Sequence, residues 1–424
     1  MGAKFSDFLA AALLVALAVA AGVGTAAASS PRPSLRFRED GTFVIAQFTD
    51  MHYGQGTHND LRTDQVQSAV LAAEQPDLAA FSGDQVSGFA WDGSPRWFEE
   101  RWRQLLQPTM AAGVPHASIL GNHDGEANLG RREIVELDQR LGGNWTLSLP
   151  GPRYLFGAGN YYLDVLNATG EGVAARMWFL DSGSLGCEGL RDGWGCVPSG
   201  TVDWVAERAA ALPHVPSLAF IHIPLPQFLE LWNSQPTRGS KGEAVACPLR
   251  DTGVFEAFRQ LGIEAVYSGH DHLIDFYGTL GGVRLAYGRK TGYGNYGPAG
   301  AKGARIIRLR QGQSAALSAT WIRTEDGKRQ DQNSMLTLPQ LKRAQPACGA
   351  NAWLWQRLHD RSVLTLVTVC AAGGCSLVVA SASLTALAMR WRQRACRKAP
   401  AGEGFDDEEQ AFLRSPASSA SCSP

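Results

Sequence analysis

The sequence predicts an α/β fold for the central part of the chain, because short apolar runs alternate there with amphipathic stretches of helical spacing. The apolar runs have the length of buried strands and lie at Phe43–Thr49, Asp77–Phe81, His116–Leu120, Arg176–Leu180, Ser217–Ile221 and Ile263–Ser268. The intervening stretches predict helices over Thr63–Glu74, Pro95–Leu106, Arg131–Leu141, Val202–Leu212 and Val254–Leu261. Ser94 is the expected cap of the second helix, with Pro95 in its first turn.

A second sheet is expected between Leu273 and Ile322, where closely spaced strand-like runs are joined by glycine-rich turns. The runs are Leu273–Tyr277, Val283–Tyr287, Arg305–Leu309 and Ala316–Ile322. The loop Gly288–Pro298, rich in glycine and tyrosine, is a candidate either for a substrate cleft or for a structural turn.

Composition narrows the class of protein. With 45% hydrophobic and 19% charged residues the chain is globular, and its formal net charge of −1 creates no overall attraction to nucleic acid. No basic stripe with interleaved aromatic residues is present in the sequence, so nucleic-acid binding is not expected.

The two ends of the chain predict a membrane-anchored topology. Residues 1–28 have a lysine near the start, an apolar run and a small-residue site, which is the layout of a cleaved signal peptide; an uncleaved anchor is the alternative. Residues 362–389 contain no charged side chain and are followed by a basic cluster, so they predict a transmembrane helix with a cytoplasmic tail at 390–424. The domain would occupy 29–323 and a polar stalk 324–361. We therefore expect a single-pass protein of the secretory pathway, with its domain in a lumen or outside the cell.

Cysteines and sequons agree with this compartment. Cys187, Cys196, Cys247 and Cys348 form an even set in the central region, which suggests two disulfides with three alternative pairings. The short loop from Cys187 to Cys196 favours that pair and leaves Cys247 with Cys348. The sequons at Asn144 and Asn167 are candidate sites for N-glycans.

Polar motifs follow the predicted strands. They are Asp50-Met51-His52, Gly83-Asp84, Gly121-Asn122-His123-Asp124, His222 and Gly269-His270-Asp271-His272. Ligand-binding groups gather at the carboxyl ends of strands in open α/β sheets, so we expect the motifs to meet in one crevice. Imidazoles and carboxylates suit Fe, Zn or Mn ions. Two such divalent or trivalent ions can hold a bridging hydroxide that attacks a phosphate ester.

The order of these motifs resembles the calcineurin-like metallophosphoesterase superfamily, and the surrounding sequence is similar to the small plant and fungal branch of purple-acid-phosphatase-like proteins. The resemblance extends from about Leu35 to Ile322 and implies a four-layer α/β/β/α sandwich. It also implies two metal positions that share Asp84. One would be completed by Asp50, His52 and His272, and the other by Asn122, His222 and His270. His123 would face the leaving group as general acid or electrostatic stabiliser, oriented by Asp124.

The chain departs from purple acid phosphatases at two positions of this pattern. Those enzymes have glycine where His52 stands and a tyrosine ligand where Ser87 stands. His52 can supply the missing ligand, so the loss of tyrosine predicts a colourless site with less preference for ferric iron rather than an inactive one. The arginine with which protein serine/threonine phosphatases extend the Gly83-Asp84 motif is also missing, which argues against that class.

The sequence therefore predicts a metal-dependent hydrolase of phosphate monoesters, acid-phosphatase-like, acting outside the cytosol. A phosphodiesterase is the alternative within enzymes, because many diesterases of the superfamily share the Asp-x-His motif. A membrane receptor or adhesion module on an inactive scaffold is the alternative from another class.

Overall fold

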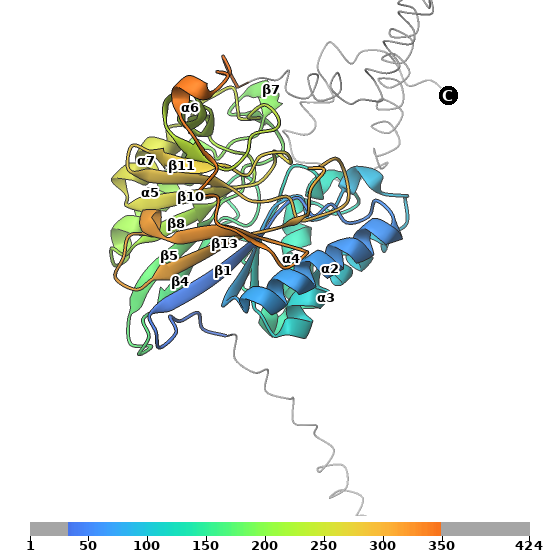
Figure 1. The fold of residues 1–424 in the computed structure, drawn as a ribbon. Coiled ribbons are helices and arrows are strands. Elements are labelled where there is room, and N and C mark those ends of the chain that lie inside the picture. Colours follow the sequence, from blue (N-terminus) through green and yellow to red (C-terminus); the bar gives the residue numbers. More distant parts are fainter. Residues whose placement is uncertain (1–32, 349–424) are drawn as a thin grey trace, which may run out of the picture. The chain divides into compact units, whose positions relative to one another are not determined.

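The computed structural model describes residues 33–348, and the expected signal peptide, transmembrane helix and tail lie outside this range. Two sheets pack face to face, and helices cover the outer face of each, which gives four layers (Figure 1). Within residues 33–348 no helix is both long and apolar enough to cross a bilayer.

The first sheet has six strands in the order β15-β14-β13-β1-β2-β3, with β1, β2 and β3 parallel and β13 antiparallel to β1. Its strands are β1 (Thr42–Phe48), β2 (Leu78–Ser82), β3 (His116–Ile119), β13 (Gly303–Arg310), β14 (Ala319–Thr324) and β15 (Arg329–Gln330). The covering helices are α2 (Thr57–Glu74), α3 (Trp97–Ala112) and α4 (Arg131–Gly142).

The second sheet has eight strands in the order β16-β9-β11-β12-β10-β8-β5-β4. They are β4 (Tyr161–Leu166), β5 (Val173–Phe179), β8 (Ser217–Phe220), β9 (Thr237–Arg238), β10 (Ile263–Ser268), β11 (Tyr277–Leu280), β12 (Val283–Tyr287) and β16 (Leu336–Thr337). Helices α5 (Ser199–Ala211), α6 (Pro226–Ser234) and α7 (Val254–Gln260) pack on it. A separate hairpin joins β6 (Leu185–Cys187) to β7 (Leu190–Trp194). Short 3-10 helices lie at Gly88–Ala90, Asp124–Glu126, Gly143–Trp145, Ala315–Leu317 and Pro339–Leu341.

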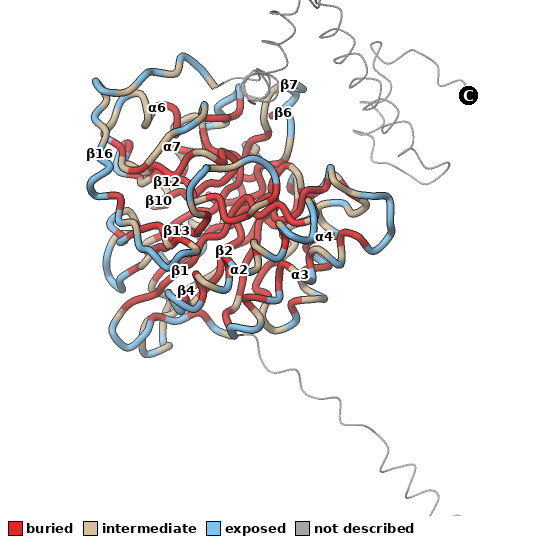
Figure 2. The backbone as a smooth tube through the Cα atoms, turned by 45° about the vertical axis from the view of Figure 1, so that its right-hand side comes forward, coloured by how far each residue is buried: buried red, intermediate tan, exposed pale blue. Residues whose placement is uncertain are grey.

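The core has three layers of apolar side chains, as strand β1 illustrates. Successive side chains of a strand point to opposite faces. Phe43 and Ile45 therefore pack between the two sheets, while Val44 and Ala46 pack under the helices. Both faces of β1 are buried, which explains its nearly continuous apolar sequence (Figure 2). With its own core and both partners of each disulfide, this part of the chain has the properties of an independently folding domain.

The structure corrects the expected pairing of the later strands. The runs between Leu273 and Ile322 do not form a sheet of their own, because β11 and β12 extend the sheet of β10 whereas β13 and β14 join β1. The run Leu273–Tyr277 lies mostly outside any strand, and β11 starts only at Tyr277. Helix α3 begins at Trp97 rather than Pro95, and the Ser94 carbonyl accepts a hydrogen bond from the Trp97 N–H. A periodic pattern reveals that a strand exists, but not which partner it pairs with.

Residues 325–348, expected to begin a stalk, belong to the domain. Strand β15 pairs with β14, and β16 pairs with β9. The Gln345 side chain bonds both backbone groups of Val245, and Cys348 forms a disulfide with Cys247. The other disulfide joins Cys187 to Cys196, so the pairing favoured from the sequence is confirmed. The domain thus extends beyond the boundary expected at residue 323.

Candidate metal centre

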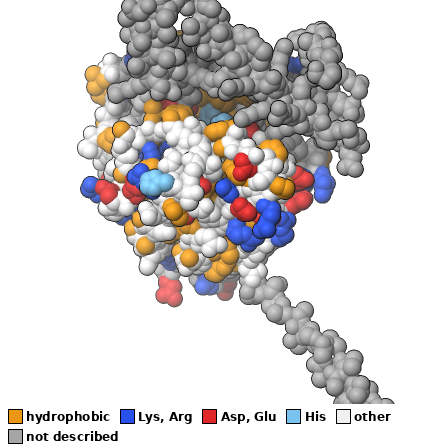
Figure 3. Space-filling model, turned by 90° about the vertical axis from the view of Figure 1, so that its right-hand side faces the viewer, with side chains coloured by type: hydrophobic (Ala, Val, Ile, Leu, Met, Phe, Trp, Pro, Cys, Tyr) orange, Lys and Arg blue, Asp and Glu red, His pale blue; other side chains and the backbone are white. Residues whose placement is uncertain are grey.

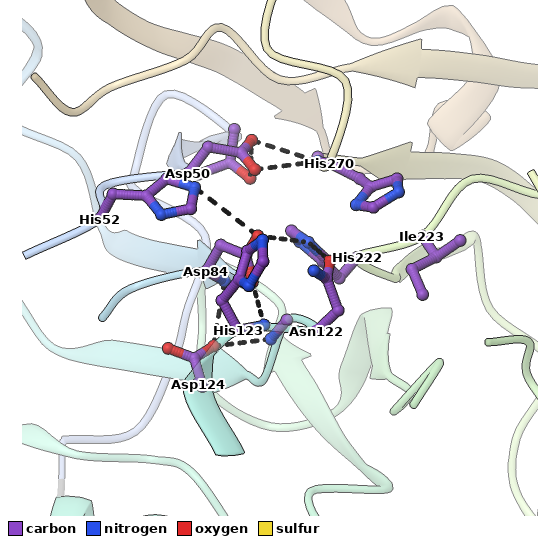
Figure 4. Close-up of polar contacts among 12 residues, drawn as sticks. Asp50, His52, Asp84, Asn122, His123, Asp124, His222, Ile223 and His270 are labelled. Atoms are coloured by element: carbon purple, nitrogen blue, oxygen red, sulfur yellow. Dashed lines mark hydrogen bonds and ion pairs between the residues drawn. The ribbon is translucent and has the colours of Figure 1, made fainter. Parts of the chain in front are cut away.

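The sequence motifs converge at the carboxyl ends of strands from both sheets. Asp50 and His52 follow β1, Asp84 follows β2, and Asn122 follows β3. His222 follows β8, and both His270 and His272 follow β10. Their side chains are buried and point into one space, as Figure 4 shows for His52, His222 and Asn122 around Asp84. The structure therefore brings together every residue that was expected to bind metal.

Tight turns aim these side chains inward. The φ angles of Asp50, His52 and Asp84 are 53°, 55° and 52°, in the left-handed region that side chains other than glycine rarely adopt. Such backbone conformations are most common at functional sites, where the surrounding structure holds them. Gly83 is required beside Asp84, because its φ is 99° and an added Cβ would lie 2.2 Å from Nδ1 of His222.

Two groups of potential ligands share the Asp84 carboxylate. The first contains Asp50, His52, Asp84 and His272, and the second contains Asp84, His222 and His270, with the ligand atoms of each group within 4.8 Å of one another. Oδ2 of Asp84 lies 3.2 Å from Nε2 of His222 and 3.6 Å from Nε2 of His52. Oδ1 of Asn122 lies 3.1 Å from Nε2 of His222, so the amide joins the second group.

Hydrogen bonds fix the orientation of the histidine rings. Nδ1 of His222 donates to the Ser82 carbonyl at 2.9 Å, and Nδ1 of His272 donates to the Tyr296 carbonyl at 2.8 Å. A carbonyl only accepts, so Nδ1 carries the hydrogen, and in the neutral ring the lone pair is on Nε2. Such partners commonly orient histidines that bind metals. In the neutral rings, the lone pair of His222 thus faces Asp84 and that of His272 faces Asp50.

The donor set fits metal ions. Nε2 of His52 and Nε2 of His272 face each other at 3.1 Å, and the buried Nε2 of His270 has no hydrogen-bond partner. A buried polar atom without a partner is costly, and a cation at each position would satisfy these nitrogens. Nitrogen and carboxylate donors of this kind suit Zn, Fe or Mn.

The charges of the site also favour cations. Burial opposes the ionisation of Asp84, but His222, His123 and His52 outweigh it and hold the pKa of Asp84 well below its usual value. Burial would likewise lower the pKa of His222, yet the Asp84 carboxylate raises it to about 9. Burial and the charge of His222 lower the pKa of His270 to about 3. The Asp84 carboxylate therefore stays ionised and would supply negative charge to bound ions.

The prediction that Asp124 orients His123 is wrong. The Asp124 carboxylate accepts hydrogen bonds from the backbone N–H groups of Gly121, Asp84 and Val86 at 2.7, 3.0 and 2.8 Å. Nδ1 of His123 instead lies 2.7 Å from Oε2 of Glu126, while the His123 N–H donates to Oδ1 of Asp84. Asp124 therefore joins the loops after β2 and β3, and Glu126 orients His123.

Residues 43–273 match the family model for calcineurin-like phosphoesterases. The chain belongs to the calcineurin-like phosphoesterase family.

Its relatives lie in the purple-acid-phosphatase-like branch. The "Probable inactive purple acid phosphatase 28" of Arabidopsis thaliana is 32% identical over 70% of this chain and 84% of the plant protein. "Phosphatase DCR2" of Saccharomyces cerevisiae is 27% identical over 60% of this chain and 48% of the yeast protein. Among solved structures, a dimetal phosphatase from Danio rerio covers 68% of this chain and 96% of its own, with 13% identity and a TM-score of 0.47.

Two basic side chains support the loops of the site, a role that the sequence pattern did not indicate. Nζ of Lys290 donates to the Asp50 carbonyl at 2.8 Å, and Arg131 donates to the Gly121 and Leu120 carbonyls while it pairs with Asp181. Both therefore hold backbone that carries potential ligands, and Lys290 is buried rather than exposed in a cleft. Tyr296, from the same glycine-rich loop, stacks on His272 with 4.2 Å between ring centroids.

Proposed function

We propose that the protein is a dinuclear metal-dependent hydrolase of phosphate esters, with phosphate monoesters as its preferred substrates. The observation that carries this proposal is the pair of buried ligand groups that share Asp84, within a chain of the calcineurin-like family. Asp50, His52, Asp84 and His272 would hold one ion, and Asp84, Asn122, His222 and His270 the other. Two ions so held would lower the pKa of a water nucleophile and neutralise charge on the phosphoryl group.

His123 is placed to act on the leaving group. Its side chain is 26% exposed, whereas the ligands beneath it are buried, and its N–H contacts Asp84 (Figure 4). Burial would lower the pKa of His123, but Asp84 and then Glu126 raise it above the usual value. The ring therefore keeps its second proton to a higher pH than an ordinary imidazole does. The ring can transfer this proton to a leaving oxygen. Alternatively, it can donate a hydrogen bond to a phosphoryl oxygen.

The name of the Arabidopsis relative includes the words "probable inactive", yet the residues of this chain support activity. His52 lies in the first ligand group with its ring fully buried, so this group has a nitrogen donor beside Ser87. Each ion would thus have four protein ligands, counting Asp84 twice. An inactive scaffold would have no need for this many buried ionisable side chains, because their desolvation is costly.

The experiment that tests the proposal is metal analysis of the purified protein, followed by turnover of p-nitrophenyl phosphate and of its bis-ester. We expect two ions per chain and faster hydrolysis of the monoester. Hydrolysis of the bis-ester alone would replace the monoesterase with a phosphodiesterase. Fewer than one ion per chain, without turnover, would favour a binding scaffold.

Asn122→Ala tests the ligand assignment itself. Removal of the amide should abolish turnover and reduce the metal content at the position shared with His222 and His270. Asn128→Ala is the matched control, because that amide bonds only the Pro95 carbonyl on the surface side of the same loop. Unchanged activity of Asn122→Ala would refute the assignment.

We also infer that the domain lies in a lumen or outside the cell, anchored by residues 362–389. The two disulfides and the sequons at Asn144 and Asn167 support this location. Treatment of the cellular protein with an endoglycosidase should increase its gel mobility, and alkaline extraction should leave it in the membrane. A protein that alkali releases, without glycans, would contradict the proposed location.

A further inference from the structure

Partly exposed aromatic side chains surround the opening of the metal centre. Phe89 is 39% exposed and packs edge-on against His123, with 4.9 Å between ring centroids. Tyr296 is 38% exposed and stacks on His272. Because the His123 side chain is 26% exposed, solvent reaches the metal centre beside Phe89.

The hairpin β6–β7 borders this opening. The Trp194 ring meets His270 edge-on at 4.4 Å, and Oγ of Ser184 donates to the Asn122 carbonyl. Leu185 is the antiparallel partner of Trp194, so the two side chains point to the same face. Leu185 is nevertheless 70% exposed. The hairpin thus presents an apolar side chain to solvent beside Trp194, which contacts the potential ligand His270.

Further exposed apolar side chains continue from Leu185. The Leu249 side chain lies against Gly193 of β7, where an added Cβ would come within 2.9 Å of its Cγ, and the Phe156 ring lies against Gly183. The exposed fractions are 74% for Tyr154, 56% for Phe156, 70% for Leu185, 42% for Leu190 and 47% for Leu249. We call these five residues the apolar rim. Soluble monomers seldom expose a continuous surface of this kind unless it binds something.

The described chain ends beside the apolar rim. Cys348 is joined by its disulfide to Cys247, two positions before Leu249. Figure 1 shows the final described segment, drawn in orange, at the same end of the domain as β7. On the face drawn in Figure 3, hydrophobic side chains lie among polar ones at several places on the surface. Residues 349–361, which connect to the uncharged segment 362–389, can span at most about 45 Å.

We propose that the apolar rim lies on the lipid bilayer in which residues 362–389 are anchored, so that the metal centre acts on phosphate monoesters carried by membrane lipids. The substrate class rests on the proposed function, whereas the contact with lipid does not. Leucine and phenylalanine side chains enter the boundary between headgroups and acyl chains, and tyrosine favours the same depth. The exposed Arg153, next to Tyr154, suits anionic headgroups. His123 would then meet a lipid phosphate at the level of the headgroups.

The contact with lipid is tested on the domain alone, residues 33–348, by flotation with vesicles of phosphatidylcholine and phosphatidylserine. We expect the domain to float, and Leu185→Ser combined with Leu190→Ser to weaken partitioning at least about tenfold. Leu317→Ser is the matched control. That leucine is 74% exposed but follows Ala315, whose N–H contacts Glu264 near the start of β10, at the opposite end of the strand from the metal centre. It should not alter flotation.

Several outcomes would overturn the contact with lipid. The proposed contact fails if the domain stays in the soluble fraction. It also fails if Leu317→Ser reduces flotation as much as the double leucine variant does. If the domain instead forms a dimer that the double variant abolishes, without binding vesicles, the surface belongs to a second copy of the chain. Thermal unfolding checks that the double variant folds, which we expect because both side chains are exposed.

The substrate class is tested on the full chain reconstituted in vesicles that contain phosphatidic acid, with p-nitrophenyl phosphate supplied in solution. The double leucine variant should lose at least about tenfold in phosphatidic acid hydrolysis relative to p-nitrophenyl phosphate hydrolysis. An unchanged ratio would overturn the lipid substrate. Absence of turnover with both substrates would instead refute the proposed function, and flotation would still decide the contact with lipid.

Discussion

Oγ of Ser87 lies 2.8 Å from Nδ1 of His52, so the residue at the position of the missing tyrosine supports the side chain that replaces it. Ser87 also accepts a hydrogen bond from Nε2 of Gln55 at 2.5 Å. When Nδ1 of His52 donates to this oxygen, Nε2 is left free to face Asp84 and His272. The serine and the histidine therefore form one unit, and the loss of the tyrosine alone says nothing about activity.

This relationship predicts that the ligand type can be exchanged by two substitutions. His52 has a φ of 55°, which glycine adopts readily, so His52→Gly with Ser87→Tyr should fold and place a phenol oxygen beside the first ligand group. The iron-loaded double variant should gain a visible charge-transfer band that the natural protein lacks. Ser87→Tyr alone is the control. The tyrosine side chain would have no room beside His52. This single variant should therefore bind less iron and lack the charge-transfer band. A colourless double variant with full iron content would contradict this geometry.

Glu126 should set the pH dependence of turnover through His123. Its carboxylate holds Nδ1 of His123 at 2.7 Å and contributes to the raised pKa of that ring. Glu126→Gln should lower the pKa of His123, because it removes a negative charge. The alkaline limb of the kcat/KM profile should then move to lower pH by up to about one unit. Glu136→Gln, an exposed carboxylate on α4, should leave the profile in place. If Glu126→Gln lowers the rate equally at every pH, the glutamate has only a structural role.

Metal binding should release protons from His222. Without metal its pKa is about 9, because Asp84 outweighs the effect of burial, so the ring is protonated near neutral pH. A ligand must give up this proton, and metal affinity should therefore rise with pH, by up to about tenfold per unit below the pKa of the ring. Calorimetric titration of Zn in buffers of different ionisation enthalpy measures the protons released. We expect about one from this residue, and release of none would contradict its assignment as a ligand.

The parts that followed from the sequence are those set by local pattern. Strand β10 has the predicted bounds, and β1 agrees within one residue, because buried strands have distinctive runs of apolar residues. The motifs after β1, β2 and β3 converge because these strands are parallel neighbours, and the motifs after β8 and β10 converge for the same reason. The packing of the two sheets then brings both sets together. The ligand positions were therefore predictable, and their grouping around Asp84 came from the family resemblance.

What the sequence missed depends on contacts between distant segments. The carboxylate of Asp124 is held by backbone N–H groups of the loop after β2, so it is not available to His123. The residue types in a sequence do not show which backbone N–H groups a carboxylate will bind. The hairpin β6–β7 was not predicted either, because its strands are short and glycine-rich, yet it brings Trp194 to His270.

The buried pair of His116 and Asp138 should control the stability of the domain in acid. Nε2 of His116 on β3 lies 2.9 Å from Oδ1 of Asp138 on α4, and both side chains are fully buried. Burial would raise the pKa of Asp138, but His116 and the hydroxyl of Thr146 lower it to about 2. The folded pKa is thus below that of the unfolded chain. The resulting stability is present above about pH 4 and is lost as the pH falls toward about 2, and its size is about 2 kcal/mol.

Denaturant unfolding of the metal-free protein at several acidic pH values measures this contribution. Asp138→Asn should lower the free energy of unfolding by about 3 kcal/mol near neutral pH, because it leaves His116 without its partner. The difference between the variant and the natural protein should shrink as the pH falls, since protonation removes the same charge from Asp138. Asp331→Asn, at an exposed surface pair with Arg329, should change stability by less than about 0.5 kcal/mol. A difference for Asp138→Asn that stays constant with pH would mean that its effect comes from packing and not from charge.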